Sequence, residues 1–309
     1  MPPRLALTAL LLAIVPPGGA DAATSDSIEL TTLCGVEADE SPDPGRLGEE
    51  ELKALALATW KSEVRAAAIG ELHRRFPSDG NRALAMNAEA LGELRADRPE
   101  RAFAAFARVE ARFGRSSADP AVGTEIARSL RGRAQSLDLR ADLDHMAGRP
   151  ADFGPGSEAN RMRRTLVERF GGHSEPAIRL IVGEERLNLL HAARSAAGGR
   201  YDPGPYLALA ADYGNDPHFA DLVAEIMFDM LMSEQDPRRK LGFADAFLDR
   251  FAGVAASAGV REKVRDAFGW KAFAQERLGD LRGAERTRGE EQSWAERTER
   301  RYSSGQDCV

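Results

Sequence analysis

The chain has 309 residues, of which 29% are charged, and its formal net charge is −7 at pH 7. This mildly acidic balance argues against general nucleic-acid binding, because such binding relies on basic patches that pair with phosphates. No apolar run beyond residue 15 approaches the about 18 residues that a membrane-spanning helix requires, so we expect no transmembrane span.

Residues 1–23 have the features of an export signal. Arg4 supplies the positive start, and Leu5 to Val15 form an apolar stretch that is too short to cross a bilayer as a helix. The tripeptide Ala-Asp-Ala at residues 20–22 then provides a small-x-small cleavage site. We therefore expect a cleaved signal peptide and a periplasmic or secreted mature protein. The alternative is an uncleaved amphipathic start or a short core helix.

Residues 24–48 form an acidic segment that contains the sequence Ser-Pro-Asp-Pro-Gly. The segment has no lasting apolar periodicity, which predicts a disordered arm or linker. Cys34 lies in this arm, and Cys308 lies in a flexible tail expected at residues 302–309. Exported proteins can form disulfides, so an intrachain bridge, a bridge to another chain and two free thiols all stay open.

Residues 49–301 are expected to form an α-helical repeat domain. Alanine, glutamate and arginine are abundant there, and no alternating strand pattern with hairpin signals is present. Aromatic landmarks return at intervals of roughly 40 to 60 residues, a spacing typical of stacked helical repeats. Four landmarks follow an arginine and the fifth is a tyrosine: Phe76, Phe113, Phe170, Phe251 and Tyr213.

Each landmark predicts the end of the second helix of a repeat unit. The residue four positions before it is apolar in every copy: Leu72, Val109, Leu166, Leu209 and Phe247. Residues four apart share one helix face, so these pairs predict a buried stripe. Seven positions before the landmark the stripe continues in every copy but one, where Arg163 interrupts it.

The first helix of each unit has its own start signal and core spacing. An acidic residue before proline predicts a helix start at Asp119-Pro120, Glu175-Pro176 and Asp216-Pro217. After the last landmark, a core stripe is expected at Val260, Val264, Ala267, Trp270 and Ala274. The pattern predicts about five helix-turn-helix units.

The stretch from Asn87 to Phe113 resembles a tetratricopeptide-type repeat. Ala102 and Phe106 match the Ala-x3-Phe element of that family's second helix, and Ala90 matches a small close-packing position on its first helix. The resemblance implies an all-α fold, a TPR-like α-solenoid. The first helices of such an array would line a concave surface that binds other proteins.

One repeat unit is longer than its neighbours, and the extra length lies near residues 139–160. We expect this insert to be either a loop or a degenerate extra helix pair. A long loop is often an inert surface feature, but it can also carry a docking function.

Nothing in the sequence indicates catalysis, a cofactor or a metal site. The nucleophile elbow, the phosphate-binding loop, the dinucleotide-binding glycine pattern and the His-Glu-x-x-His zinc motif are all absent. The five histidines are scattered, and none stands at helical spacing from another histidine or a cysteine. Glu184 and Glu185 are adjacent, so they diverge by about 100° on a helix and are expected to face solvent.

Two groups of residues are candidates for partner binding. Asn87 and Asn188 are expected near the middle of first helices, where a side-chain amide can hold the backbone of a bound peptide. Arg161, Arg163 and Arg164 form a local basic cluster. This cluster either docks an acidic partner or is a solvated helix face balanced by nearby glutamates.

The expected function is that of an exported, non-catalytic scaffold or adaptor that binds another envelope or secreted protein. The alternative is an all-helical enzyme, or accessory subunit, that acts on envelope polysaccharides. Such an enzyme would need a glutamate with a raised pKa in a closed cleft. A self-assembling structural subunit is a third reading.

Overall fold

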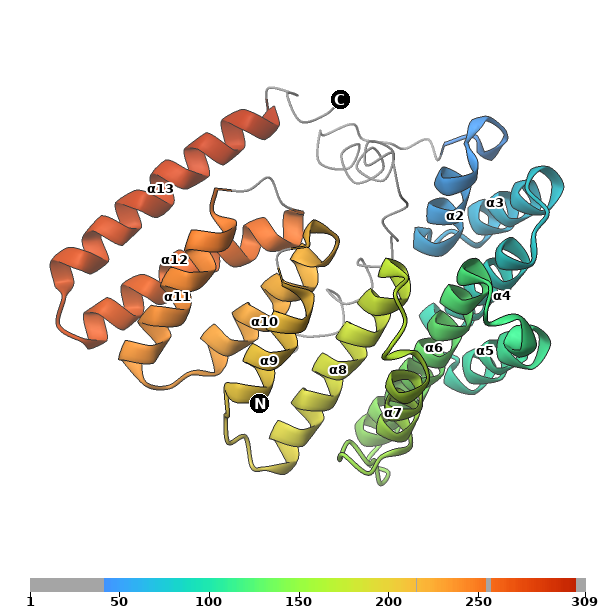
Figure 1. Ribbon diagram of the computed structural model, residues 1–309, viewed down its shortest axis with the longest axis horizontal. Helices are drawn as coiled ribbons and strands as arrows, with labels where there is room; N and C mark the ends of the chain where they lie inside the picture. Colours follow the sequence, from blue (N-terminus) through green and yellow to red (C-terminus); the bar gives the residue numbers. More distant parts are fainter. Residues whose placement is uncertain (1–41, 215, 254–256, 304–309) are drawn as a thin grey trace. The chain divides into compact units, whose positions relative to one another are not determined.

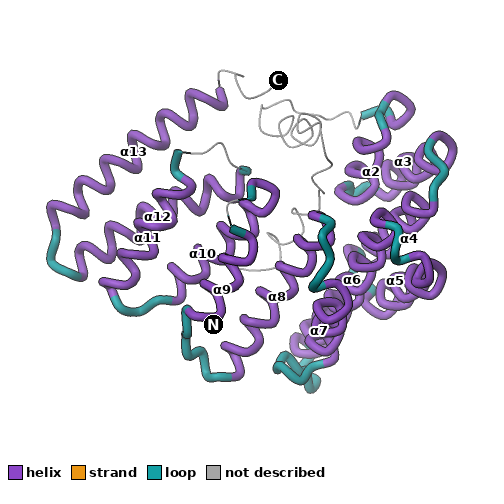
Figure 2. The backbone as a smooth tube through the Cα atoms, in the orientation of Figure 1, coloured by secondary structure: helices purple, strands orange, loops and turns teal. Residues whose placement is uncertain are grey.

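The computed structural model describes residues 42–214, 216–253 and 257–303, with side chains described up to residue 300. Every regular element in these ranges is helical, which confirms the all-α prediction (Figure 2). The expected signal peptide, most of the acidic arm, Cys34 and Cys308 lie outside the described residues. In the described ranges, no helix combines the length and the apolar character needed to cross a bilayer.

The chain divides into two compact units, residues 1–185 and 186–309. Unit 1 contains η1 (Pro44–Arg46), α2 (Glu49–Ala58), α3 (Ser62–Arg75), α4 (Asp79–Arg95), α5 (Pro99–Phe113), η2 (Gly114–Ser116), α6 (Pro120–Met146) and α7 (Glu158–Phe170). The boundary falls within α8 (Pro176–Ala196). Unit 2 contains α9 (Gly204–Tyr213), η3 (Pro217–Phe219), α10 (Ala220–Ser233), α11 (Pro237–Phe251), α12 (Ala258–Arg277) and α13 (Leu281–Ser303).

The helices of each unit pack in sequential pairs (Figure 1). In unit 1, α2 packs on α3, α4 on α5 and α6 on α7, and α4 also packs on both α2 and α6. Unit 2 follows the same rule, because α10 contacts α11, α12 contacts α13, and α10 contacts α12. Each pair thus buries its apolar stripe against its own partner and against the next pair.

The aromatic landmarks stand at helix ends, as the spacing predicts. Phe113, Phe170, Tyr213 and Phe251 are buried final residues of α5, α7, α9 and α11. Phe76 is the residue that caps the end of α3. In all four Arg-Phe steps the guanidinium lies over the ring of the next residue, with 4.9–5.4 Å between its central carbon and the ring centroid. The repeated dipeptide is therefore a cation–π pair at a helix end.

Acidic residues before proline start helices, again as predicted. The Asp119 carboxylate accepts hydrogen bonds from the backbone of Ala121 and Val122 at 2.9 and 3.1 Å, which caps α6. Asp216 caps η3 in the same way, by accepting from the His218 backbone at 3.0 Å.

The described end of the acidic arm is ordered and attached to unit 1. Residues 44–46 form η1, and the Arg75 guanidinium donates to the carbonyl oxygens of Gly45 and Leu47 at 3.3 and 2.7 Å. The expectation of disorder through residue 48 is therefore corrected for these residues, because a side chain from α3 satisfies their backbone.

The insert near residues 139–160 is not an extra helix pair. Its first part lengthens α6, which has 27 residues, and its middle is a loop over residues 147–157. Helix α7 begins directly after this loop. Gly148, with φ +70°, permits the turn that ends α6.

The core of unit 1 depends on a close approach between α5 and α6. Phe106 is 1% exposed, and its ring lies against Gly132, where an added Cβ would stand 2.4–2.6 Å from three ring carbons. We expect Gly132→Ala to lower the free energy of unfolding by about 1–3 kcal/mol, because the ring must be displaced. Gly70 is a helical glycine with open space around it, so Gly70→Ala should stabilise the chain slightly. Equal effects of both substitutions in urea unfolding would contradict the close approach.

Candidate functional site

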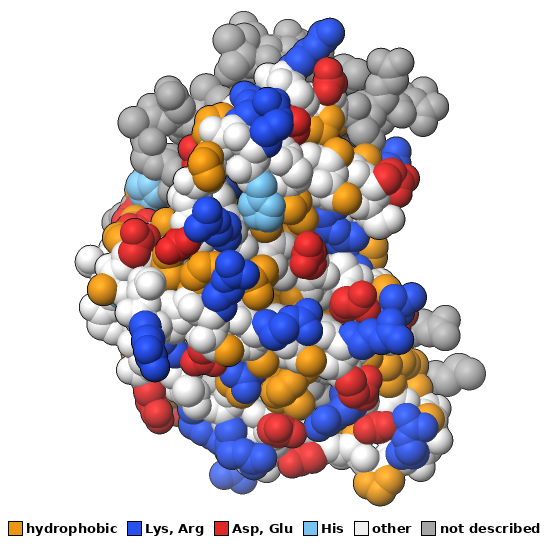
Figure 3. Space-filling view, turned by 90° about the vertical axis from the view of Figure 1, so that its right-hand side faces the viewer, with side chains coloured by type: hydrophobic (Ala, Val, Ile, Leu, Met, Phe, Trp, Pro, Cys, Tyr) orange, Lys and Arg blue, Asp and Glu red, His pale blue; other side chains and the backbone are white. Residues whose placement is uncertain are grey.

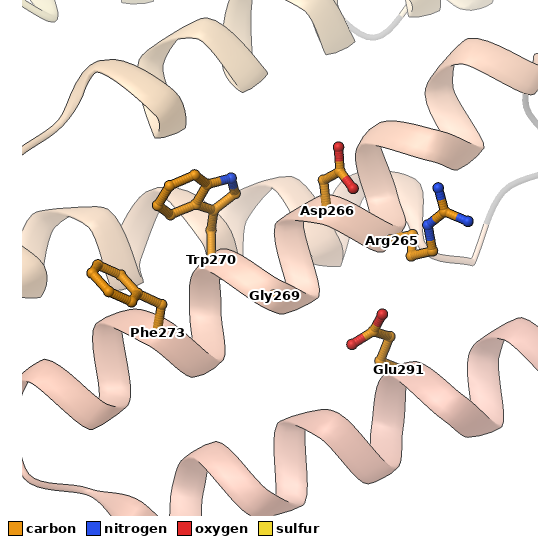
Figure 4. Close-up of a pocket in the computed structure, with 6 residues that line it drawn as sticks. All are labelled: Arg265, Asp266, Gly269, Trp270, Phe273 and Glu291. Carbon is orange, nitrogen blue, oxygen red and sulfur yellow. The ribbon is translucent and has the colours of Figure 1, made fainter.

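A groove of about 470 Å³ lies between α12 and α13 in unit 2 (Figure 4). It is lined by Arg265, Asp266, Gly269, Trp270, Phe273 and Glu291. Helix α12 supplies all of these residues except Glu291, which projects from α13 toward α12. The groove combines two aromatic side chains with charged side chains of both signs.

Helical spacing brings the groove residues of α12 to one side. The opposite side is buried through Val260, Val264 and Ala267, so residues offset from this stripe face outward. Gly269 has no neighbouring atom within 4 Å of a Cβ position, which leaves the floor of the groove open. The expected core stripe is thus correct for its aliphatic members, but Trp270 is half-buried and lines the groove instead.

Trp270 and Phe273 form the apolar part of the groove. Their rings meet edge to face, with centroids 5.7 Å apart and planes at 85°. Phe273 is 44% exposed, which is high for a phenylalanine. Aromatic side chains that are partly exposed, as these are, are enriched at surfaces that bind other proteins.

A buried lysine holds the indole ring in place. Lys240 is 6% exposed, and its Nζ lies 4.1 Å from the centroid of the Trp270 ring. Burial lowers the pKa of Lys240, and the nearby Glu234 offsets this in part. Because Lys240 belongs to α11, it ties the groove to a third helix and makes Trp270 a fixed wall.

The charges in the groove are mainly acidic. Asp266 and Glu291 supply two carboxylates, and Arg265 supplies one guanidinium. The arrangement fits an apolar side chain that is flanked by a basic one, because the rings take the first and the carboxylates take the second. One residue of this site, Trp270, stood in the core stripe expected from the sequence.

The Asn87 amide was expected to hold the backbone of a bound peptide, but the structure buries it in unit 1. Asn87 is 0% exposed, and its amide donates to the backbone oxygen and to the carboxylate of Glu125, both at 2.8 Å. It therefore joins α4 to α6 inside unit 1 and does not face a groove. Asn188 is half-buried on α8, and its role in partner binding stays a prediction.

The three arginines of the predicted basic cluster on α7 do not share one exposed face. Arg161 and Arg164 donate to the carbonyl oxygens of Gly156 and Pro155 at 2.6 and 2.8 Å, which fastens the 147–157 loop. Arg163 is 9% exposed and points into unit 1. Its place seven residues before Phe170 explains this, because that position belongs to the buried stripe.

Arg163 belongs to a buried ion network that joins α6, α7 and α8. Its Nε lies 2.9 Å from the Glu185 carboxylate, and its other nitrogens contact Asp138. Glu185 is 1% exposed, and Arg131 pairs with Glu184 and lies 3.5 Å from Glu185. The expectation that both glutamates face solvent was wrong. Because the two side chains diverge on α8, Glu184 contacts Arg131 of α6, and Glu185 contacts mainly Arg163 of α7.

Glu184 is the group in this network whose pKa is most displaced. Burial raises the pKa of Glu184 to about 7, although the neighbouring Arg131 opposes the shift and Glu185 adds to it. The Glu184 side chain is 18% exposed and does not line the α12–α13 groove.

A second polar contact lies in unit 2. His191 Nε2 is 2.6 Å from the Asp229 carboxylate, and the imidazole ring lies 6.2 Å from the ring of Tyr206. A carboxylate can orient a histidine, but nucleophilic catalysis also needs a nucleophile within hydrogen-bond reach of the base. We therefore assign this pair to the packing of α8 against α10.

Among residues 42–214, 216–253 and 257–300, no three histidine, cysteine, aspartate or glutamate side chains gather so that they could hold a metal ion. Basic, acidic and apolar side chains are interspersed on the face of the molecule in Figure 3. Comparison of the whole chain with protein families, curated proteins and solved structures found no match.

Proposed function

We propose that this chain is an exported, non-catalytic scaffold or adaptor that binds a segment of another protein. The observation that carries the proposal is the α12–α13 groove, in which a partly exposed aromatic pair lies beside two carboxylates. The pairing of helices in each unit supports a TPR-like repeat array as the framework. The export signal expected at residues 1–23 supports a periplasmic or secreted location.

The chemistry of the groove defines the partner segment. Trp270 and Phe273 suit an apolar anchor, and the carboxylates of Asp266 and Glu291 suit a neighbouring lysine or arginine. Aromatic side chains in well-packed positions often supply most of the binding energy at such surfaces. The preferred ligand is therefore a peptide segment with one apolar side chain next to a basic one.

Phe273→Ala should weaken binding of this segment at least about tenfold, because it removes half of the aromatic pair. The measurement is fluorescence anisotropy with labelled peptides that carry one apolar anchor and either a basic or an acidic neighbour. Phe153→Ala is a matched control, since Phe153 is 46% exposed and lies in the 147–157 loop. Equal binding of basic and acidic peptides, or equal losses in both variants, would contradict the proposed groove.

The rival enzymatic reading draws on Glu184, whose pKa of about 7 is the property that a catalytic acid needs. However, the carboxylate of Glu184 is paired with Arg131 inside a helical packing interface. Incubation of the chain with envelope polysaccharides decides between the two readings. Product release that Glu184→Gln abolishes would replace the scaffold proposal with a hydrolytic one.

A further inference from the structure

Arg65, on α3 in unit 1, is a buried cation without a counter-ion. It is 9% exposed, and its Nη1 has no hydrogen-bond acceptor. The guanidinium lies flat against Gly92 of α4, where an added Cβ would stand 2.8 Å from Nη1. In the described part of the chain, no carboxylate pairs with this side chain.

A second arginine beside it also lacks a carboxylate partner. Arg95, on α4, donates only to the backbone oxygens of Thr59 and Leu57, at 2.8 and 2.5 Å, and its buried Nε has no acceptor. Burial and the neighbouring charge of Arg65 both lower the pKa of Arg95. The Arg65 guanidinium packs against Gly92, one turn before Arg95 on α4, so the two like charges are neighbours. Each guanidinium also has a buried donor without an acceptor.

This arrangement is costly unless something else offsets it. A buried charge normally has an opposite charge or a full set of hydrogen bonds, because it has given up its hydration. Arginine is also the side chain best suited to carboxylate and phosphate groups, since its donors form a planar fork. An anion with oxygen acceptors is therefore the group whose chemistry best suits these buried donors.

The arginine pair lies close to the surface of unit 1. Trp60 is 64% exposed, and the Arg95 guanidinium lies over its ring, 5.2 Å from the centroid. Since no hydrogen bond holds the Arg65 guanidinium in place, it can turn toward an incoming anion without breaking one. Trp60 would then form an apolar wall beside the bound group.

We propose that Arg65 and Arg95 form a binding site for an oxyanion, a carboxylate or phosphate group, which enters beside Trp60 and supplies the missing acceptors. The site lies in unit 1 and is independent of the α12–α13 groove in unit 2. An anion bound there would be held by two arginines, although the chain as a whole carries a net charge of −7.

The test is a titration of the full chain with sodium phosphate and with sodium acetate, each compared with sodium chloride at equal ionic strength. The wild-type melting temperature should rise saturably with one of these oxyanions beyond the effect of chloride. The oxyanion that gives the larger rise in melting temperature shows whether the natural ligand binds through a phosphate or a carboxylate group. Arg65→Met should weaken this binding at least about tenfold, because it removes charge-assisted hydrogen bonds.

Arg82→Met is the matched control. Arg82 is an exposed arginine of unit 1 that pairs with Asp79, and its loss should leave the oxyanion effect intact. If Arg65→Met does not fold, Gly92→Ala serves instead, because its methyl group displaces the guanidinium while both charges stay. A wild-type chain that responds to phosphate and acetate as it does to chloride would overturn the proposal. So would variants at residues 65 and 92 that keep wild-type affinity.

Discussion

Replacing Arg163 with methionine should lower the free energy of unfolding by about 3–5 kcal/mol. Arg163 is 9% exposed and holds the Glu185 carboxylate at 2.9 Å and the Asn160 amide oxygen at 3.0 Å. Without it, the Glu185 carboxylate, which is 1% exposed in the native chain, keeps only Arg131, whose Nε lies 3.5 Å away. A buried carboxylate without an adequate partner is among the largest single destabilising effects in a folded protein.

Urea unfolding of Arg163→Met and Arg161→Met provides the measurement. Arg161 is an exposed residue of the same helix, and its side chain donates to one loop carbonyl. Its replacement should therefore change the free energy of unfolding by less than about 0.5 kcal/mol. Adding Glu185→Leu to Arg163→Met should recover part of the loss, because the unpaired carboxylate is then gone. Similar losses for residues 161 and 163 would contradict the buried pair.

The helices of this chain could be predicted because their signals are local. An aromatic residue that ends a helix shares a face with the apolar residue one turn earlier, as Phe170 does with Leu166. Both residues are buried in the structure. A carboxylate before proline caps its own helix, so Asp119 could be placed without any knowledge of the fold.

The network and the groove could not be predicted because they depend on distant pairings. Arg163 and Glu185 are 22 residues apart, and nothing in the sequence couples them. The interruption of the stripe at residue 163 did indicate an unusual position, but its partner depends on how α8 packs. Trp270 was expected in the core for a similar reason. Whether its side of α12 is covered or lines the groove depends on where α13 packs.

Glu184→Gln should leave the stability of the protein nearly unchanged at pH 4 and raise it at pH 8. Burial, opposed by Arg131, raises the pKa of Glu184 from its ordinary value of 4.5 to about 7. The folded protein thus binds this proton more tightly than the unfolded chain does, so its contribution is complete below pH 4.5 and is lost as the pH rises through 7. One pKa unit corresponds to about 1.4 kcal/mol, so the expected loss is on the order of 3 kcal/mol.

The informative quantity is the difference in unfolding free energy between wild type and Glu184→Gln at pH 4, 6 and 8, because other titrating groups cancel in it. Glu158→Gln is the control, since Glu158 pairs with Arg140 and both side chains are about half exposed. Such a surface pair contributes little at any pH. A wild type that gained stability over Glu184→Gln as the pH rose would mean that the attraction of Arg131 outweighs burial. The expected result would instead show that burial among α6 and α8 outweighs the attraction of Arg131 and raises the pKa of Glu184.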